Sequence, residues 1–247
     1  MLRLEGVAKR FGGVVATDNV TLEVARGEVH ALIGPNGAGK TTLIGQVSGS
    51  LAPDSGKVMF FDKDITHLPQ HARVAAGLAR SFQITSIFRR FSVLDNLALA
   101  VQARSGSSFS FWKPVSSEKI LVDEALSIAE EVGLSEKTSS LAATLAHGEQ
   151  RALEVGLALA TRPKLLLLDE PMAGMGPEES SRIIELIQRV RASVTLLLVE
   201  HDMDAVFRLA DRISVLVNGR IIATDLPQKI KLNDEVRRAY LGDEVAA

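Results

Sequence analysis

The chain has 247 residues, of which 46% are hydrophobic and 23% are charged, with a formal net charge of −2. This length can bury a large core without disulfides or metal, and the slight acidity argues against a broadly basic surface for nucleic acid. The absence of cysteine excludes disulfides, cysteine-ligated zinc, iron–sulfur clusters and thiol nucleophiles. Aliphatic runs such as Leu165–Leu168 are far too short to span a membrane, and charge appears too early for a signal peptide. We expect an intracellular protein that reaches a membrane only through a partner.

Short apolar or alternating segments separated by glycine-containing turns predict strands in the first third of the chain. Helical spacing dominates from residue 84 to about residue 153, and strands then alternate with helices again. This order is typical of an α/β protein interrupted by a helical insert. The predicted strands are Leu2–Val7, Val20–Val24, Val29–Ile33, Val58–Phe61, Ala79–Gln83, Lys164–Leu168, Thr195–Val199, Ile213–Val217 and Arg220–Ala223. The predicted helices open at Lys40 and cover Val93–Arg104, Ile120–Val132, Glu149–Ala160, Pro177–Ala192, Met203–Leu209 and the tail beyond Leu226.

A glycine-rich segment lies between the strand Val29–Ile33 and the helix that opens at Lys40. It fits the pattern G-x-x-x-x-G-K-[ST] in the context that this motif requires, with the residues Gly34, Pro35, Asn36, Gly37, Ala38, Gly39, Lys40 and Thr41. Glycines let consecutive backbone N–H groups turn toward a phosphate, and the helix N-terminus adds its dipole. Lys40 supplies a charge for the β- and γ-phosphates, and the Thr41 hydroxyl is a ligand for Mg²⁺. The alternative is a glycine-rich turn that matches the pattern by accident.

Two carboxylates follow the apolar strand that contains Leu165–Leu168. A buried parallel strand delivers such groups to the carboxyl edge of the sheet, where open α/β folds bind ligands. We predict that Asp169 lies on the metal side and acts through water. Glu170 is predicted to orient the attacking water and take its proton. A strand followed by an acidic turn is common by itself, but together with the phosphate loop it predicts a P-loop NTPase.

Three further segments narrow the class of NTPase. They are Arg80–Gln83, the segment Leu145–Arg151 just before the carboxylate strand, and Val199–Asp202, which contains His201. These segments resemble the Q-loop, the signature motif and the switch histidine of ATP-binding-cassette (ABC) ATPases. The resemblance covers essentially the whole chain, in order and spacing.

The resemblance is also specific within that family. Four segments look like the ATPase subunits of bacterial branched-chain amino acid importers: Ala79–Gln83, Phe91–Leu97, Glu200–Met203 and Val236–Gly242. It implies a P-loop NTPase core of α/β class, with a mixed or parallel sheet, an N-terminal antiparallel β subdomain and an inserted α-helical subdomain. As one ABC ATPase domain over 1–247, the chain is expected to have its core in 1–83 and 154–225, the helical signature subdomain in 84–153 and a helical extension in 226–247.

The resemblance also assigns roles to residues, several of which would read as structural or surface residues if taken alone. Phe11 matches the aromatic residue that stacks on adenine, and Gln83 would touch Mg²⁺ or the lytic water. His201 would hydrogen-bond the γ-phosphate. The implied catalytic residues are Glu170, His201 and Gln83, and the implied metal-side residues are Thr41, Gln83 and Asp169. The implied nucleotide-binding residues are Phe11, Gly34, Pro35, Asn36, Gly37, Ala38, Gly39, Lys40, Thr41 and Thr42, with Leu145, Ala146, His147, Gly148 and Glu149 facing the nucleotide of a second subunit.

Three positions depart from the family pattern, and one of them is His147, which replaces a common glycine. Ala146 replaces the usual signature serine, which removes a hydroxyl contact to the γ-phosphate. Gly176 stands where Asp or Asn is usual in the D-loop, which puts polar communication between the two nucleotide sites in doubt. Because Glu170 and His201 are both present, the catalytic half is expected to be competent.

The resemblance implies ATP and Mg²⁺ as cofactors and three kinds of partner. These are a second ABC subunit of the same or a related chain, an integral membrane permease and, indirectly, an extracytoplasmic solute-binding protein. The expected location is the inner face of the bacterial cell membrane. An apolar strip around Arg89–Arg90 within Ile84–Asn96 suits an amphipathic permease helix, although these residues also suit a small core of the insert. The aromatic residues of Ser105–Ser117 fit either loop anchors or a contact surface.

Other functions remain open at this stage. A lipopolysaccharide-type exporter ATPase shares many of the motifs. An ABC ATPase that acts on ribosomes or DNA usually carries two cassettes or a long coiled-coil insert, neither of which is present. No N-K-x-D motif for reading guanine occurs in the sequence, which disfavours a guanine-nucleotide switch.

Overall fold

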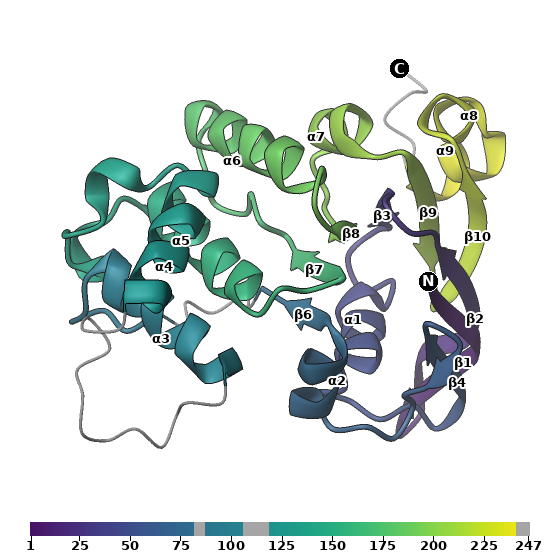
Figure 1. The fold of residues 1–247 in the computed structure, drawn as a ribbon. Helices are drawn as coiled ribbons and strands as arrows, with labels where there is room; N and C mark the ends of the chain where they lie inside the picture. The colour runs from purple at the N-terminus through teal and green to yellow at the C-terminus, as the bar shows by residue number, and fades with distance from the viewer. Residues whose placement is uncertain (82–86, 106–118, 241–247) are drawn as a thin grey trace.

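The computed structural model describes residues 1–81, 87–105 and 119–240. One sheet of the described fold has six strands: β3 (Val29–Ile33), β6 (Leu78–Arg80), β7 (Leu165–Asp169), β8 (Thr195–Val199), β9 (Arg212–Val217) and β10 (Arg220–Asp225) (Figure 1). Their order across the sheet is β10-β9-β3-β8-β7-β6. Each neighbouring pair is parallel except β9 with β10. The mixed, mainly parallel sheet predicted from the sequence is confirmed.

A second, antiparallel sheet contains β1 (Leu2–Phe11), β2 (Val14–Val24), β4 (Ser55–Phe60) and β5 (Lys63–Asp64), in the order β2-β1-β4-β5. It confirms the predicted N-terminal antiparallel subdomain. The strands β1 and β2 are longer than expected, since the prediction ended the first strand at Val7. The register of β1 against β2 shifts between Leu4 and Val7 and twice more before Phe11. Such bulges interrupt the alternation of apolar and polar residues. The predicted strand therefore ends at Val7, although β1 stays paired with β2 as far as Phe11.

The helices follow the predicted order. They are α1 (Lys40–Ser48), α2 (Gln70–Ala76), α3 (Val93–Ser105), α4 (Lys119–Glu131), α5 (His147–Ala160), α6 (Pro177–Val190), α7 (Met203–Leu209), α8 (Pro227–Leu232) and α9 (Asp234–Tyr240). Only α2 was missed. It lies between Pro69 and a left-handed Gly77, and proline before a helix with glycine after it is the boundary signal that could have revealed it. The predicted loop Ser105–Ser117 lies almost wholly outside the described residues.

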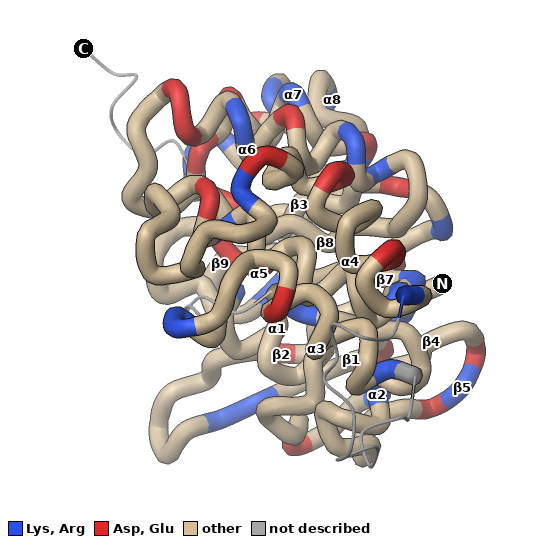
Figure 2. The backbone as a smooth tube through the Cα atoms, turned by 60° about the vertical axis from the view of Figure 1, so that its left-hand side comes forward, with Lys and Arg blue, Asp and Glu red and all other residues tan. Residues whose placement is uncertain are grey.

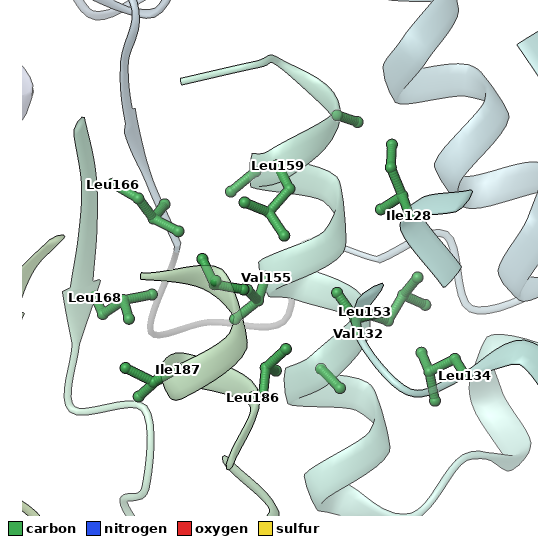
Figure 3. Close-up of a cluster of buried hydrophobic side chains, with 14 of the residues drawn as sticks. Ile128, Val132, Leu134, Leu153, Val155, Leu159, Leu166, Leu168, Leu186 and Ile187 are labelled. Carbon is green, nitrogen blue, oxygen red and sulfur yellow. The ribbon is translucent and has the colours of Figure 1, made fainter. Parts of the chain in front are cut away.

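The central strands β3, β8 and β7 of the six-stranded sheet are buried on both faces. Leu166 and Leu168 of β7 point toward α4, α5 and α6, where they join Leu153, Val155, Leu159 and Ile187 (Figure 3). Leu165 and Leu167 point the other way, toward α1 and the antiparallel sheet. Continuous leucine runs are what a parallel strand covered on two faces requires. Because these strands are packed on both faces, their ends are held in place, and the candidate site is built from those ends.

The helical insert shares its core with the sheet. One continuous buried cluster runs from α3 and α4 through α5 to β7 and α6. The expected subdomain boundary at residue 153 falls inside α5, a single unbroken helix. Figure 2 shows acidic and basic residues interspersed along the backbone. Within the described parts of the chain, no helix combines the length and apolar character needed to cross a membrane.

Candidate functional site

Three neighbouring parallel strands end side by side at one edge of the sheet. Leu32 of β3 is paired with Val199 of β8, and Val199 is paired with Asp169 of β7. The phosphate loop, His201 and Glu170 each follow one of these strands within a few residues. The sheet register therefore brings together three motifs that are far apart in the sequence. This edge is where open α/β sheets bind ligands.

The phosphate loop is enclosed by backbone from two other strands. A Cβ atom at Gly34 would lie 2.1 Å from the Leu216 carbonyl oxygen of β9, and one at Gly39 would lie 2.1 Å from the Ala16 carbonyl oxygen of β2. Gly39 is also the N-cap of α1, with a left-handed φ of 104°. Only glycine fits these positions. The loop is therefore a preformed turn whose N–H groups lie at the N-terminus of α1, where anions bind.

Lys40, the first residue of α1, bends back over the loop. Its Nζ donates to the carbonyl oxygens of Gly34 at 2.7 Å and Pro35 at 3.1 Å. Burial lowers the pKa of Lys40, while the charges of Glu170 and Asp169 oppose that effect. The lysine thus lies within the field of both carboxylates. Thr41 is exposed and Thr42 is partly exposed, so the hydroxyl predicted to hold a metal is accessible.

Asp169 ends β7 and is almost completely buried, with 3% of its surface exposed. Its Oδ2 accepts a hydrogen bond from Nη2 of Arg80, the last residue of β6, at 2.8 Å. The Arg80 Nε is a buried nitrogen without a hydrogen-bond partner among the described residues. Sequence reasoning did not single out Arg80, although it lies inside the segment that carried the family resemblance. A charged residue at the end of a short strand beside the carboxylate strand was the available signal.

Glu170 leaves β7 in an unusual backbone conformation. Its φ is +47°, in the left-handed region, where a residue with a side chain carries strain that native structures concentrate at functional sites. Its N–H donates to the Val199 carbonyl oxygen of β8 at 2.9 Å. The residue is partly exposed. The strand end is thus held in place while the carboxylate stays accessible to solvent.

His201 follows β8 and is exposed, whereas the preceding Glu200 is fully buried. Glu200 accepts hydrogen bonds from the N–H of Met172 at 2.9 Å and from the N–H of His201 at 3.0 Å. Burial raises the pKa of Glu200, although the backbone donors and His201 act in the opposite direction. Sequence reasoning missed this residue. Its signal was a charged side chain directly after an aliphatic strand.

The signature segment lies at the N-terminus of α5. The Ala146 N–H donates to the Glu149 carboxylate at 3.0 Å, and Lys137 pairs with the same side chain at 2.7 Å. Burial alone would raise the pKa of Glu149, but these two partners outweigh it and the pKa is lowered. The Gly148 N–H points to Oε1 of Glu179, on α6, at 3.4 Å. A carboxylate is the kind of group that a helix N-terminus attracts.

Two further residues predicted for the site are Phe11 and Gln83. Phe11 ends β1 and is 51% exposed, and Lys9 Nζ lies over its ring, 5.7 Å from the ring centroid. Gln83 lies outside the described residues. The roles assigned to individual residues therefore stay predictions, while their placement at one sheet edge is observed for the phosphate loop, Asp169, Glu170 and His201.

The donor set at this edge fits a magnesium–nucleotide complex. It combines glycine N–H groups and Lys40, which suit phosphates, with a hydroxyl and a carboxylate. Oxygen donors of these two kinds are what Mg²⁺ prefers, and the ion takes its other ligands from water and phosphate. The glycine cradle, which a side chain would fill, is the structural observation that favours a bound phosphate chain.

Comparison with known proteins identifies the class. The family model described as ABC transporter matches residues 17–173, which is more than half of the chain. A crystal structure of the ADP conformation of an ATP-binding cassette from an ABC transporter superposes with a TM-score of 0.86 and 32% sequence identity, covering 98% of both chains. The chain belongs to the ABC transporter family of ATP-binding cassettes.

Two curated relatives place the chain within that family. LivG of Escherichia coli (strain K12), a high-affinity branched-chain amino acid transport ATP-binding protein, is 38% identical over 250 residues and 98% of both chains. LptB of the same organism, a lipopolysaccharide export system ATP-binding protein, is 36% identical over 244 residues and 98% of both chains. The resemblance predicted from the sequence, to ATPase subunits of branched-chain amino acid transporters, is confirmed.

Proposed function

We propose that this chain hydrolyses ATP to drive the uptake of branched-chain amino acids, or a similar small polar solute, through a separate permease. The observation that carries the proposal is the register of β3, β8 and β7, which sets the phosphate loop, His201 and the Asp169–Glu170 pair at one sheet edge. Similarity to LivG supports the choice of solute class. At the inner face of a membrane, the chain would work as a peripheral subunit.

In the proposed nucleotide binding, backbone groups hold the phosphates. The N–H groups of the loop between Gly34 and Thr41 cradle the β- and γ-phosphates, and the N-terminus of α1 adds its dipole. Lys40 exchanges the loop carbonyls that it now contacts for phosphate oxygens. Thr41 and Asp169 would hold Mg²⁺, which supplies charge neutralisation for the phosphates when bound. The exposed ring of Phe11 stacks on the adenine.

Hydrolysis uses the side chains that follow β7 and β8. Glu170 accepts a proton from water as the water oxygen attacks the γ-phosphorus, and the bond from that phosphorus to the bridging oxygen breaks to release ADP and phosphate. His201 donates a hydrogen bond to the γ-phosphate as charge spreads over its oxygens. Because Glu170 is already fixed to β8 through its N–H, little reorganisation is needed.

The site is completed by a second cassette. The Gly148 N–H and the N-terminus of α5 form a second anion site that lies on the helical side of the chain. In our proposal this end faces the γ-phosphate bound to the partner subunit, so that two chains sandwich two nucleotides head to tail. Glu179, which now receives the Gly148 N–H, gives way to that phosphate.

A permease contact is supported by apolar surface beside the sheet and on the insert. Phe88 and Phe91 are both more than two-fifths exposed and stack at a centroid distance of 5.5 Å. A mainly apolar hollow of about 240 Å³ lies between α2, β6 and α5. Such surfaces suit an amphipathic helix of a membrane partner. An extracytoplasmic binding protein would act through that permease.

The experiment is Glu170→Gln, measured as MgATP binding and as phosphate release. We expect ATP binding within about twofold of wild type and turnover reduced by at least about 100-fold, since general-base catalysis typically contributes that much. Dimer formation should increase, because bound ATP is no longer consumed. Asp202→Ala, a change at the N-cap of α7, is the matched control and should keep wild-type turnover. Unaltered turnover in Glu170→Gln would reject its proposed role.

The second candidate is a lipopolysaccharide exporter ATPase, favoured by the similarity to LptB. Membranes that contain the full chain together with its genomically neighbouring permeases separate the two functions. Uptake of radiolabelled leucine into vesicles, dependent on ATP and a periplasmic binding protein, supports the importer. Vectorial release of lipopolysaccharide without leucine uptake would establish the exporter in its place.

A further inference from the structure

Glu200 is a fully buried carboxylate between the two loops that carry His201 and Glu170. Its exposed surface is 0%. One carboxylate oxygen, Oε1, accepts the N–H of Met172 at 2.9 Å, and the other, Oε2, accepts the N–H of His201 at 3.0 Å. The Asp202 N–H lies 3.5 Å from Oε2. One side chain thus spans two segments that are 28 residues apart in the sequence.

The segment after β7 is attached at two points, once to β8 and once to Glu200, the residue that follows β8. The first is the hydrogen bond from the Glu170 N–H to the Val199 carbonyl oxygen. The second is the bond from the Met172 N–H to Glu200. Between them, the Ala173 N–H closes a turn on the Glu170 carbonyl oxygen at 3.1 Å. Glu170 is held in the left-handed region, and both attachments restrain this strained backbone.

Two acceptor atoms are needed at this position. A carboxylate can accept N–H groups with both oxygens, whereas an amide of the same shape offers one acceptor and turns an NH₂ donor toward the second group of N–H donors. An apolar residue would leave the Met172 and His201 N–H groups without this partner. Burying a carboxylate is costly, and burial raises the pKa of Glu200.

We infer that Glu200 is a positioning residue that fixes the Glu170 turn and the His201 turn relative to each other. Its carboxylate accepts backbone N–H groups from both loops and lies 3.7 Å from Nδ1 of the His201 ring, so it acts through the residues that these loops carry. The inference rests on the proposed function, because it assigns Glu200 to the hydrolytic step in which Glu170 and His201 act. It predicts a residue that matters for turnover and not for nucleotide affinity.

The test compares Glu200→Gln with wild type and with Asp202→Ala in the purified full-length chain. Asp202 caps α7 through the N–H groups of Asp204 and Ala205, so its loss loosens the first turn of α7 and leaves the bonds from Met172 and His201 to Glu200 in place. Three readouts are taken: kcat and KM for MgATP, affinity for a fluorescent ATP analogue, and hydrogen exchange of the amides in residues 170–176 and 201–206.

In Glu200→Gln we expect kcat to fall about tenfold, with KM and nucleotide affinity within about twofold, as when an interaction made only in the transition state is lost. Amide protection should fall at His201, while Met172 keeps much of its protection because the remaining oxygen still accepts its N–H. Glu200→Met should remove protection at both residues and lower kcat further. Asp202→Ala should lose protection only near residues 204–206 and keep its kcat.

Three outcomes would overturn the inference. They are an unchanged kcat in both Glu200 variants, a loss of nucleotide affinity equal to the loss of kcat, and unchanged exchange at Met172 in Glu200→Met. Failure of the proposed function is seen separately, as equal turnover in wild type and Glu170→Gln. The hydrogen-exchange measurement does not depend on turnover. It therefore tests the two hydrogen bonds made by Glu200 whether or not the proposed function holds.

Discussion

The N-termini of α1 and α5 use the same physical device, yet they are built in different ways. At α1 the glycines are enclosed, since a Cβ atom at Gly39 would lie 2.1 Å from a backbone carbonyl oxygen of β2. At α5 the atoms nearest to a Cβ atom at Gly148 would belong to the side chain of Glu179, at 3.5 Å or more. One helix end is closed by the chain's own backbone. The other is open and has only a side chain in front of it.

This difference teaches what each end requires to work. The α1 end is complete within one chain, so its amides are preorganised for phosphate. At the α5 end, the carboxylate of Glu179 receives the Gly148 N–H. The open end matches the proposal that its anion comes from a second subunit. Substitutions at the two ends should therefore separate effects on folding from effects on turnover.

The largest expected effect is at the enclosed end. Gly39→Ala forces a side chain into the Ala16 carbonyl oxygen and into a left-handed φ of 104°. We expect the free energy of unfolding to fall by about 3 kcal/mol and ATP binding to be lost. Gly37→Ala is the matched control, because Gly37 also has a positive φ but open space around it; it should cost about 1 kcal/mol. Denaturant unfolding measures both, and equal losses would contradict an enclosed cradle.

The open end should respond in the opposite way. Gly148→Ala places a methyl group in ordinary contact with Glu179, so the free energy of unfolding should stay the same or rise by about 0.5 kcal/mol. Turnover should fall about 100-fold, which corresponds to about 2.7 kcal/mol, because the methyl group would stand between the amide and the partner's phosphate. Phosphate release and ATP binding, measured together, check this. Wild-type turnover in Gly148→Ala would remove α5 from the catalytic site.

A smaller effect is expected in the framework of the open end, by which we mean α3, α4 and the residues that follow α5. Glu124 of α4 accepts both Nη atoms of Arg104 on α3, at 2.8 and 2.7 Å, and the Nε of Arg162 at 3.0 Å. Glu124→Gln weakens these hydrogen bonds, and we expect a loss of about 1 kcal/mol in the free energy of unfolding. Turnover should stay within about twofold of wild type. A loss of turnover greater than twofold would show that this framework sets the geometry of α5.

The same carboxylate gives the smallest effect, a dependence on pH. The hydrogen bond from Arg104 lowers the pKa of Glu124 below its ordinary 4.5; burial acts against this, and Arg162 adds to the lowering. Since the folded-state pKa is depressed, the stabilisation is fully present above pH 4.5 and is lost as the pH falls through the folded value. The difference in unfolding free energy between wild type and Glu124→Gln should therefore shrink below pH 4.5. A difference that grew on acidification would contradict the ion pair.

The sequence predicted the parts of the site that are local. The phosphate loop and the pair Asp169–Glu170 each consist of consecutive residues at a strand end, and the leucine runs in β7 and β8 mark strands buried on two faces. The resemblance added His201 and the signature segment. These residues could be placed in advance because their spacing along the chain carries the information.

The contacts that the sequence did not predict join distant segments. Arg80 reaches Asp169 across 89 positions, and Glu200 reaches Met172 across 28. No periodicity encodes such pairs, because they depend on strand order and on how a turn leaves its strand. The same reason explains the unpredicted length of β1, where bulges rather than residue types control the pairing.

The ion pair between Arg80 and Asp169 has a consequence for the order in which ligands arrive. A bare divalent cation that approached Asp169 would meet a guanidinium held 2.8 Å from that carboxylate, and repulsion between like charges is strong where water is excluded. A cation that is already coordinated by phosphate oxygens arrives together with their negative charge, which offsets this repulsion. If Asp169 has its proposed role, this site would therefore favour magnesium that is already bound to the nucleotide over free magnesium.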